Sequence, residues 1–553
     1  MSYQLTIEQA GRRSDVEISR GVSRLDLPDF PATNLVVTVE DSAARLELTA
    51  EPWSNDLHLS VAVPRSGTAP IAHWPSYQGI LHSYQDPAGV GYEFRGPGWD
   101  SPEHDDRRLG IPLVILEEEG RFQLIGTDPG YSADISVEDD GAVRIGWTYL
   151  AAAGRHDIVR RIVMAEAGSI EEALDAWFTL ATPDVPRGPD WLHEIGWQHY
   201  DFMSHNGEGW FDDIDSMCEI VAPEDRSRVA FTLHAWYDTV GRYCFDPDTK
   251  QLDERWTVFP YMNDPLLLAV EGVEQTGTQP RGYQFRNLRD YRPLEMDWDE
   301  VRRRILYAKD RGFRVPFYFI TGMMDLGDAA EHVMAGDGLN AEGHTLWTGP
   351  EAIGANYLMN PLHPAVRERI LGLTSALLER VGDLIDALVI DEAYFIGYGK
   401  LGPAAQPGYA DLAQATLVQE IATLCHAHRS DIAVLTADHM GTQYLEGQAF
   451  PYCLFADGIY HDAWNHAQAH EAARFPAWRN TTWSCIWTPE SEIANTKWAV
   501  LAYDAPISTS NGCFGDDIGI RHMSAENQEL LRKLWGSKTG SRRHRQLAEV
   551  FID

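Results

Sequence analysis

Residues 364–391 read PAVRERILGLTSALLERVGDLIDALVID, a helix-forming segment followed directly by a strand-forming one. Apolar side chains recur three and four residues apart from Val366 to Val381, which is the spacing of an amphipathic helix. The apolar run at 387–390 then ends in a carboxylate, Asp391. A short continuous apolar run is typical of a strand buried on both faces of a parallel sheet. The stretch therefore predicts an α/β unit with a carboxylate at the end of its strand.

Similar units recur along the chain after residue 191. Candidate strands lie at 195–202, 229–237, 313–321, 387–395, 432–438, 453–461, 482–487 and 506–510, with amphipathic helices between several of them. Eight strand–helix units over roughly 350 residues fit a (β/α)8 TIM barrel, with long loops after strands two and three at 239–298 and 322–363. A doubly wound open sheet is the alternative, but no glycine-rich phosphate-binding turn follows an early strand.

The first part of the chain has a period of two instead. Short apolar or alternating runs lie at 35–39, 46–48, 57–63, 113–116 and 122–125. Such short strands predict an antiparallel β-sandwich. A helical stretch at 170–180 follows, and then a proline-rich connector. We expect a β-sandwich domain at 1–182, a linker at 183–190 and a catalytic barrel at 191–553.

Composition narrows the class of protein. The 553 residues are 44% apolar and 23% charged, which excludes a disordered chain and suits more than one domain. Lys and Arg number 45 against 83 Asp and Glu, so the formal charge is −38, and we expect no nucleic-acid partner and no membrane. Six scattered cysteines and the lack of a signal-peptide pattern indicate a cytoplasmic protein. A basic stretch at 538–545 leaves a homo-oligomer open.

Polar side chains gather where the predicted strands end. The residues concerned are Asp391, Asp438, His439, Asp457, His461, Asp462 and, in the loop after the eighth strand, Asp516. Active sites of TIM barrels lie at the C-terminal ends of the strands. A carboxylate after an apolar run is costly to desolvate unless it is paired, hydrogen-bonded or used in chemistry. For Asp391 the alternative is a structural carboxylate bonded to loop amides.

Aromatic side chains occur at the same strand ends, and the chain has 18 tryptophans in all. The candidates are Trp197, Trp236, Tyr394, Trp464 and Trp487. Aromatic faces beside carboxylates suit a sugar, whose C–H groups stack on the ring while its hydroxyls bond to polar side chains. We therefore predict a carbohydrate substrate, with Asp438, His439, His461 and Asp516 also binding it. For each aromatic residue, barrel packing is the alternative.

Two carboxylates suffice for glycosidic chemistry. Retaining enzymes hold them about 5–5.5 Å apart, and inverting enzymes about 6.5–9.5 Å apart. The ends of strands four and six can face each other across a barrel. We interpret Asp391 as the nucleophile and Asp462 as the general acid/base. Asp457 is the less favoured acid/base, because it lies within the apolar part of its strand. This chemistry needs no cofactor and no metal.

The chain resembles a divergent member of the α-galactosidase and α-glucosidase superfamily, which comprises glycoside hydrolase families 27, 31 and 36. The resemblance lies in 307–318 (YAKDRGFRVPFY), 359–370 (MNPLHPAVRERI), 386–391 (DALVID) and 515–519 (GDDIG). It implies a β-sandwich before a TIM barrel, with the nucleophile at Asp391 and the acid/base at Asp462 or Asp457. It also implies a retaining hydrolase or transglycosylase acting on α-linked sugars. Families 27 and 36 place a lysine two residues before the nucleophile, where this chain has Val389.

Two other functions remain open. A metal-dependent hydrolase of the amidohydrolase type could use His439, His461 and Asp516 as ligands. Its first strand should then offer two nearby histidines, but His199 and His205 are six residues apart and cannot reach one ion from one strand end. A non-catalytic carbohydrate-binding protein would explain the aromatic residues but not the acidic residue of strand six.

Overall fold

The structure is a computed structural model of the whole chain. It describes residues 3–19, 21–25, 33–39, 43–50, 57–64, 71–76, 80–94, 109–129, 133–149, 157–181, 188–201, 209–234, 236–238, 242–258, 294–321, 323–325, 356–358, 364–391, 409–438, 455–462, 481–485, 506–511, 520, 523–536 and 548–552. All statements below concern these residues.

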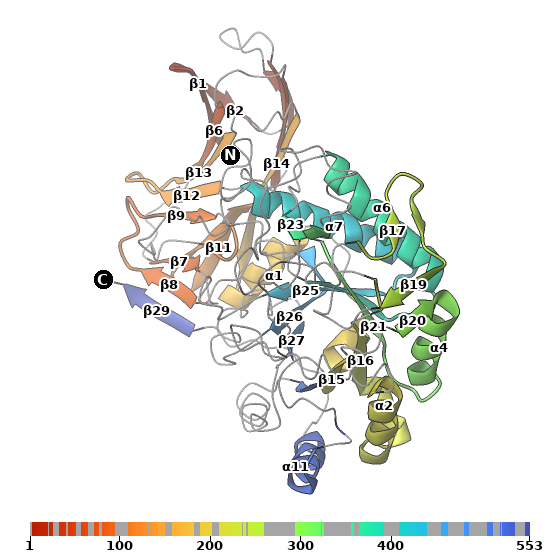
Figure 1. Cartoon of the computed structure of the whole chain (residues 1–553). Coiled ribbons are helices and arrows are strands. Elements are labelled where there is room, and N and C mark those ends of the chain that lie inside the picture. The colour runs from red at the N-terminus through yellow and green to blue at the C-terminus, as the bar shows by residue number, and fades with distance from the viewer. Residues whose placement is uncertain are drawn as a thin grey trace, which may run out of the picture.

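The N-terminal domain is a sandwich of two β-sheets (Figure 1). The six-stranded sheet has the order β2 (Arg12–Ile18), β1 (Tyr3–Gln9), β6 (Leu57–Val63), β13 (Val143–Tyr149), β12 (Ala133–Val137) and β9 (Gly91–Phe94). The nine-stranded sheet has the order β29 (Ala548–Ile552), β8 (Ile80–Tyr84), β7 (Ile71–Pro75), β10 (Leu113–Glu118), β11 (Arg121–Thr127), β14 (Asp157–Ala167), β5 (Ala43–Ala50), β4 (Thr33–Val39) and β3 (Gly21–Leu25). The five predicted strand runs fall in β4, β5, β6, β10 and β11, so the antiparallel prediction is confirmed.

One apolar core joins the two sheets. Alternating residues of β1 and β6, such as Leu5 and Leu59, are buried because side chains alternate between the faces of a strand. Trp74 of β7 stacks on Tyr92 of β9 with ring centroids 4.9 Å apart. Helix α1 (Ile170–Ala181), predicted from the sequence, packs on β10, β11 and β14 and lies between the sandwich and the parallel strands (Figure 1).

The second domain is built on an eight-stranded parallel sheet. Its order is β27 (Thr481–Cys485), β26 (Gly458–Asp462), β25 (Ala433–Asp438), β24 (Ala387–Asp391), β21 (Pro316–Ile320), β16 (Val229–Leu233), β15 (Trp197–Asp201) and β28 (Ile507–Asn511). Each of the eight predicted strands overlaps one of these strands, although β26 begins at Gly458, five residues after the start of the predicted run 453–461. Strand β28 pairs with β15, so the strands follow the cyclic order of a TIM barrel. Residues of β27 and β28 contact each other, although no hydrogen-bonded ladder joins them in the described part of the chain.

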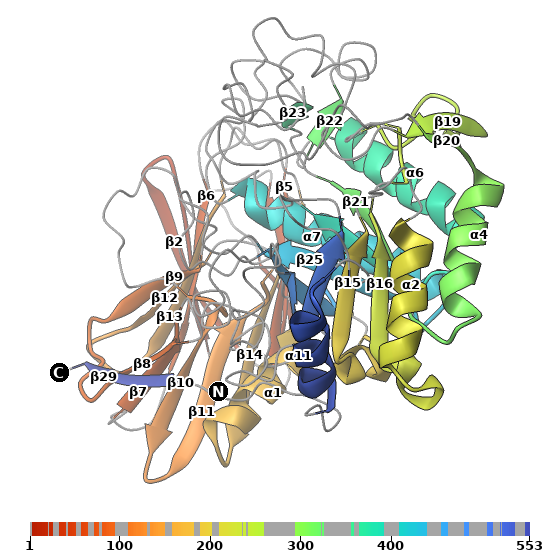
Figure 2. The same ribbon diagram turned by 60° about the horizontal axis from the view of Figure 1, so that its bottom comes forward.

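Helices cover one side of this sheet. In Figure 2, α2 and α4 lie on the outer side of β15 and β16, and α11 lies next to β15. The described elements are α2 (Gly209–Ile220), α4 (Trp298–Lys309), α6 (Pro364–Val381), α7 (Tyr409–His428) and α11 (Ala525–Gly536), with 3-10 turns at Asp190–Glu194 and Pro223–Arg228. Two-stranded antiparallel pairs join β17 (Phe245–Asp246) with β18 (Gln251–Leu252), β19 (Arg255–Val258) with β20 (Leu294–Asp297), and β22 (Met323–Asp325) with β23 (Asn356–Leu358). None of the described helices is long and apolar enough to span a membrane.

The C-terminal strand returns to the first domain. Strand β29 runs parallel to β8 of the sandwich, with Val550 opposite His82, and both strands lie at the same edge in Figures 1 and 2. The predicted barrel domain, 191–553, therefore ends in a strand of the N-terminal sheet. A five-residue strand carries no local signal that identifies a partner more than 450 residues away in sequence.

Asp386 joins three elements of the parallel-sheet domain just before β24. Its side chain is 1% exposed and accepts hydrogen bonds from Lys309 Nζ at 2.7 Å and from an Arg314 guanidinium nitrogen at 2.9 Å. The backbone N–H of Val315 donates to the same carboxylate at 2.7 Å. One buried charge thus connects the end of α4, the approach to β21 and the start of β24.

We predict that Asp386→Ala lowers the free energy of unfolding by about 3 kcal/mol, because two cations and a buried N–H lose their acceptor. Asp383→Ala is the matched control, since that carboxylate is 90% exposed beside His428 and is expected to contribute little. Urea denaturation of both variants measures the difference. Equal midpoints would contradict the role given to Asp386.

Candidate active site

The parallel sheet has a face turned away from its helices. Phe231 of β16 packs on Trp210 of α2 with ring centroids 5.9 Å apart, so the alternate residue Thr232 lies on the other face. We call that other face the inner face. Its described side chains include Gln198, Tyr200, Thr232, His234, Tyr318 and Ser510.

Aromatic rings gather on the inner face at the C-terminal ends of β16 and β21. His234 stacks on Tyr318 with centroids 3.6 Å apart and an interplanar angle of 28°. Tyr200 lies 6.2 Å from the His234 ring, and Tyr237 lies 6.4 Å from Tyr318. Tyr200, His234, Tyr237 and Tyr318 are each at most 1% exposed, so they form a packed aromatic cluster.

His234 and Tyr318 are not among the residues predicted for the site from the sequence. His234 directly follows β16, so the strand-end rule applied to the aspartates would have found it. Tyr318 lies inside the apolar strand Pro316–Ile320, where nothing in the sequence separates it from a core residue.

The backbone register relates the two proposed catalytic residues. Four residues are register partners on adjacent strands and therefore share one face of the sheet: Tyr318, Val389, Leu435 and Gly458. Asp391 is two residues after Val389, and Asp462 is four residues after Gly458, so both occupy positions of the inner face. Each is the last residue of its strand, and β25 lies between the two strands. Neighbouring strands are about 4.8 Å apart, which places the two backbones roughly 10 Å apart.

Asp438 and His461 occupy positions of the opposite face. They pair with each other across β25 and β26, and Asp438 shares its face with Thr436, which pairs with Ile390. The register therefore does not bring these two residues onto the face of Asp391, beside which the sequence analysis expected them to bind hydroxyls.

Asp457 lies at the other end of β26. It precedes the strand, and its carboxylate accepts hydrogen bonds from the Val434 backbone N–H at 2.7 Å and from His426 Nε2 at 2.9 Å. A Cβ placed on Gly188 would lie 2.5 Å from the Asp457 Cβ, so the last part of the predicted linker passes directly beside it. Asp457 is thus a buried structural carboxylate at the N-terminal end of the sheet, away from the strand end that carries Asp462.

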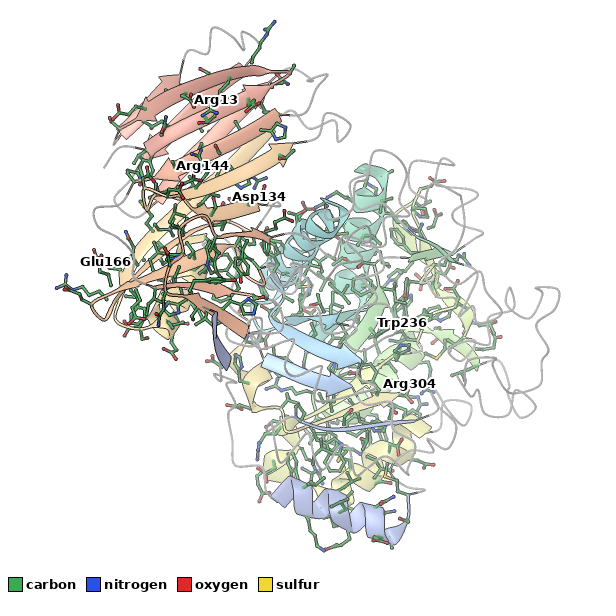
Figure 3. The ribbon with its side chains drawn as sticks, turned by 90° about the vertical axis from the view of Figure 1, so that its left-hand side faces the viewer. Arg13, Asp134, Arg144, Glu166, Trp236 and Arg304 are labelled. Atoms are coloured by element: carbon green, nitrogen blue, oxygen red, sulfur yellow. The ribbon has the colours of Figure 1, made fainter. Side chains whose placement is uncertain are left out.

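The two described tryptophans of the predicted site are core residues. Trp197 is the first residue of β15, at the N-terminal end, and its Nε1 donates to Thr509 Oγ1 at 2.9 Å. Trp236 donates from Nε1 to the Tyr318 carbonyl at 2.8 Å and stacks on Phe317 at 4.6 Å, among the strands of the parallel sheet (Figure 3). Both indoles are 0% exposed, so barrel packing, the alternative left open above, accounts for them.

A further strand-end carboxylate, Asp201, faces the helices. It shares its face of β15 with His199, which pairs with Asp213 of α2 at 3.2 Å. Arg304 of α4, labelled in Figure 3, is 2% exposed. Burial lowers the pKa of the Arg304 guanidinium, and the negative charges of Asp201 and Glu300 act in the opposite direction. This charged cluster ties α4 to the sheet behind the inner face.

The remaining predicted site residues are not placed by side chain. Only the backbone is described for Asp391, Asp438, His461 and Asp462, and five more lie outside the described residues: Tyr394, His439, Trp464, Trp487 and Asp516. No cluster of three or more possible metal ligands occurs among the described residues, which include neither His439 nor Asp516. Cys218, Cys244 and Cys425 are free thiols.

Comparison with known proteins identifies fold relatives. No protein-family model matches the chain, and no curated protein matches its sequence. A variant of the GH36 α-galactosidase AgaA from Geobacillus stearothermophilus, in complex with raffinose, matches with a TM-score of 0.52 and 13% identity, covering 97% of this chain and 74% of that chain. A GH31 family sulfoquinovosidase from E. rectale, in complex with an aza-sugar inhibitor, matches with a TM-score of 0.51 and 12% identity, covering 97% and 78%.

A third match has the same architecture. The GH36 α-galactosidase AgaB from Geobacillus stearothermophilus gives a TM-score of 0.51 at 12% identity, covering 97% of this chain and 74% of that chain. At identities this low the likeness establishes the fold. The resemblance expected from the sequence is therefore confirmed at the level of the fold, which this chain shares with GH36 and GH31 glycoside hydrolases.

We predict that Asp457→Ala destabilises the protein by about 1–3 kcal/mol, because the buried Val434 N–H loses its acceptor. Turnover per folded molecule should be unchanged, because Asp457 lies at the opposite end of β26 from Asp462. Asp431→Ala, at a carboxylate 55% exposed beside Arg429, is the surface control. A thermal melt and a glycoside assay separate the two effects. Loss of turnover in folded Asp457→Ala would restore Asp457 as an acid/base candidate.

Proposed function

We propose that this protein is a retaining glycoside hydrolase acting on an α-linked sugar. One observation carries the proposal: Asp391 and Asp462 end two strands of the parallel sheet at positions of the same inner face. The fold supports it, because the proteins that share it include an α-galactosidase with bound raffinose and a sulfoquinovosidase with a bound aza-sugar. The reaction class itself remains our inference.

The proposal includes closure of the parallel sheet into a barrel. The strands follow the cyclic order, β28 already pairs with β15, and β27 contacts β28. Closure would gather all eight strand ends around one mouth, as in TIM-barrel enzymes. Asp391 and Asp462 would then face each other across it, and two inward-reaching carboxylates would shorten their roughly 10 Å backbone separation towards the 5–5.5 Å of retaining enzymes.

The chemistry proceeds in two displacements. Asp391 attacks the anomeric carbon while Asp462 donates a proton to the leaving oxygen, which gives a covalent glycosyl-enzyme. Asp462 then takes a proton from water, and the water oxygen attacks the anomeric carbon and releases Asp391. Asp462 must be protonated at the first step while Asp391 is ionised, so the two sites must hold their carboxyl pKa values apart. An acceptor sugar in place of water would give transglycosylation.

The aromatic cluster belongs to the core of the parallel-sheet domain. His234 and Tyr318 lie on the inner face and are 1% and 0% exposed, as buried as Trp197 and Trp236. We propose that this pair supports the inner face on which Asp391 and Asp462 have their positions. A net charge of −38 is compatible with a neutral substrate. The reaction requires no cofactor, and the cytoplasmic location and oligomeric state stay predictions.

We predict that wild type cleaves one member of a panel of nitrophenyl α- and β-glycosides, and that Asp391→Asn abolishes this turnover without unfolding the protein. Asp462→Ala should lose about 10²–10⁴-fold on substrates with poor leaving groups, but retain the first step for dinitrophenyl glycosides, which need no acid. Proton NMR of the first product should show the α anomer.

Three results would contradict the proposal. Near-wild-type turnover by Asp391→Asn would remove the nucleophile, and a β-configured first product from an α-glycoside would indicate inversion. Zinc bound at one equivalent, with activity lost on its removal, would favour the metal-dependent hydrolase. Asp457→Asn serves as the control carboxylate variant, because it changes the same residue type at the far end of β26.

A further inference from the structure

Among the described residues, the pairing of β16 with β21 extends to Leu233 and Phe317. The hydrogen bonds between the two segments run from Arg314 N to Val229 O at 2.9 Å and from Phe231 N to Arg314 O at 2.8 Å. Even-numbered residues of this segment direct their backbone groups towards β16, as Arg314 does with both its N–H and its C=O. The next rung would use the carbonyl of Tyr318 and the N–H of Ile320.

Two side chains from the loop after β16 occupy that rung. The Trp236 indole N–H donates to the Tyr318 carbonyl at 2.8 Å, and the Ile320 N–H donates to the Tyr243 hydroxyl at 2.8 Å. Tyr243 and Ile320 are each 1% exposed, so water cannot take the place of these partners. The backbone groups at the C-terminal end of β21 are therefore bound by two side chains from the segment after β16.

The loop that presents Tyr243 is strained. Tyr243 and Cys244 have φ values of 60° and 53°, a left-handed conformation that L-residues other than glycine rarely adopt. Asp238 holds this turn by accepting from the Cys244 N–H at 2.8 Å and from Arg242 at 2.8 Å, and the Asp253 N–H donates to the Cys244 carbonyl at 2.7 Å. Strained backbone persists where surrounding contacts over-determine it, and it is common beside functional sites.

We propose that Tyr243 and Trp236 are positioning residues for the nucleophile. Ile320 is the register partner of Asp391, so the two side chains fix the end of the strand that lies beside it. They act through β21 and touch no substrate. The proposal rests on the assignment of Asp391 under the proposed function. Trp236 is buried in the core and cannot stack on a sugar. In this proposal it contributes to the site through its hydrogen bond to β21 instead.

Tyr243→Phe tests the proposal because it removes one hydroxyl and keeps the ring, which packs 4.8 Å from Tyr237. We expect backbone hydrogen exchange at Ile320 to rise at least about tenfold, because its N–H loses a buried acceptor. On the glycoside that wild type cleaves, kcat should fall at least about tenfold while KM stays within about twofold, since only the nucleophile is displaced. The pH profile should keep its shape.

Tyr92→Phe is the matched control. Tyr92 is 1% exposed, and its hydroxyl lies 2.8 Å from His82 Nδ1 and 2.9 Å from the Tyr84 hydroxyl, within the sandwich. It should lower the melting temperature without changing kcat. If Tyr243→Phe does not fold, Trp236→Phe removes the other bond of the same rung and should reproduce the fall in kcat with unchanged KM.

The outcomes are separable. Unchanged exchange at Ile320, or faster exchange with an unchanged kcat, overturns the positioning role. An equal fall in kcat for Tyr92→Phe would show that general destabilisation causes the loss of activity, and it would also overturn the positioning role of Tyr243. Full turnover by Asp391→Asn shows instead that the nucleophile assignment has failed, and the exchange measurement then decides by itself whether Tyr243 holds the Ile320 N–H.

Discussion

The alternation of side chains along hydrogen-bonded parallel strands determines which polar residues of this protein can meet. A one-residue difference in register transfers a side chain from the inner face to the helix-covered face. Asp391 and Asp462 have the same parity across β24, β25 and β26, whereas Asp438 and His461 have the other. All four stand near strand ends, so proximity in sequence to a strand end is not sufficient to build a site.

The direction of the strands adds a second constraint, because the two ends of the sheet carry different kinds of carboxylate. At the N-terminal ends, Asp457 accepts hydrogen bonds from Val434 and His426, and Asp386 accepts hydrogen bonds from Lys309 and Arg314. Both carboxylates are buried and hydrogen-bonded within the domain. The C-terminal ends of β24 and β26 instead carry the positions of Asp391 and Asp462. Stability at one end and the proposed chemistry at the other would match the division found in TIM-barrel enzymes.

The fold was more predictable from sequence than the site, for physical reasons. Strands such as β21 (PFYFI) and β24 (ALVID) are nearly continuous apolar runs, which is typical of buried parallel strands, whereas β28 (ISTSN) alternates with polar residues. The run at 453–461, however, does not reveal that β26 begins at Gly458, and that start leaves Asp457 outside the strand. For Trp236 the hydrogen bond to Tyr318 spans 82 residues, and for β29 the partner is β8. Contacts of that range have no local pattern, so burial in the core and binding at the surface look alike in sequence.

The segment after β16 connects these observations. The Trp236 N–H bonds to the His234 carbonyl at 3.0 Å, and the His234 ring stacks on Tyr318 while the Trp236 ring stacks on Phe317. The Trp236 indole then binds the Tyr318 carbonyl, and the strained Tyr243 binds the Ile320 N–H. Because Ile320 is the register partner of Asp391, the same segment that packs the aromatic cluster also holds the strand beside the proposed nucleophile.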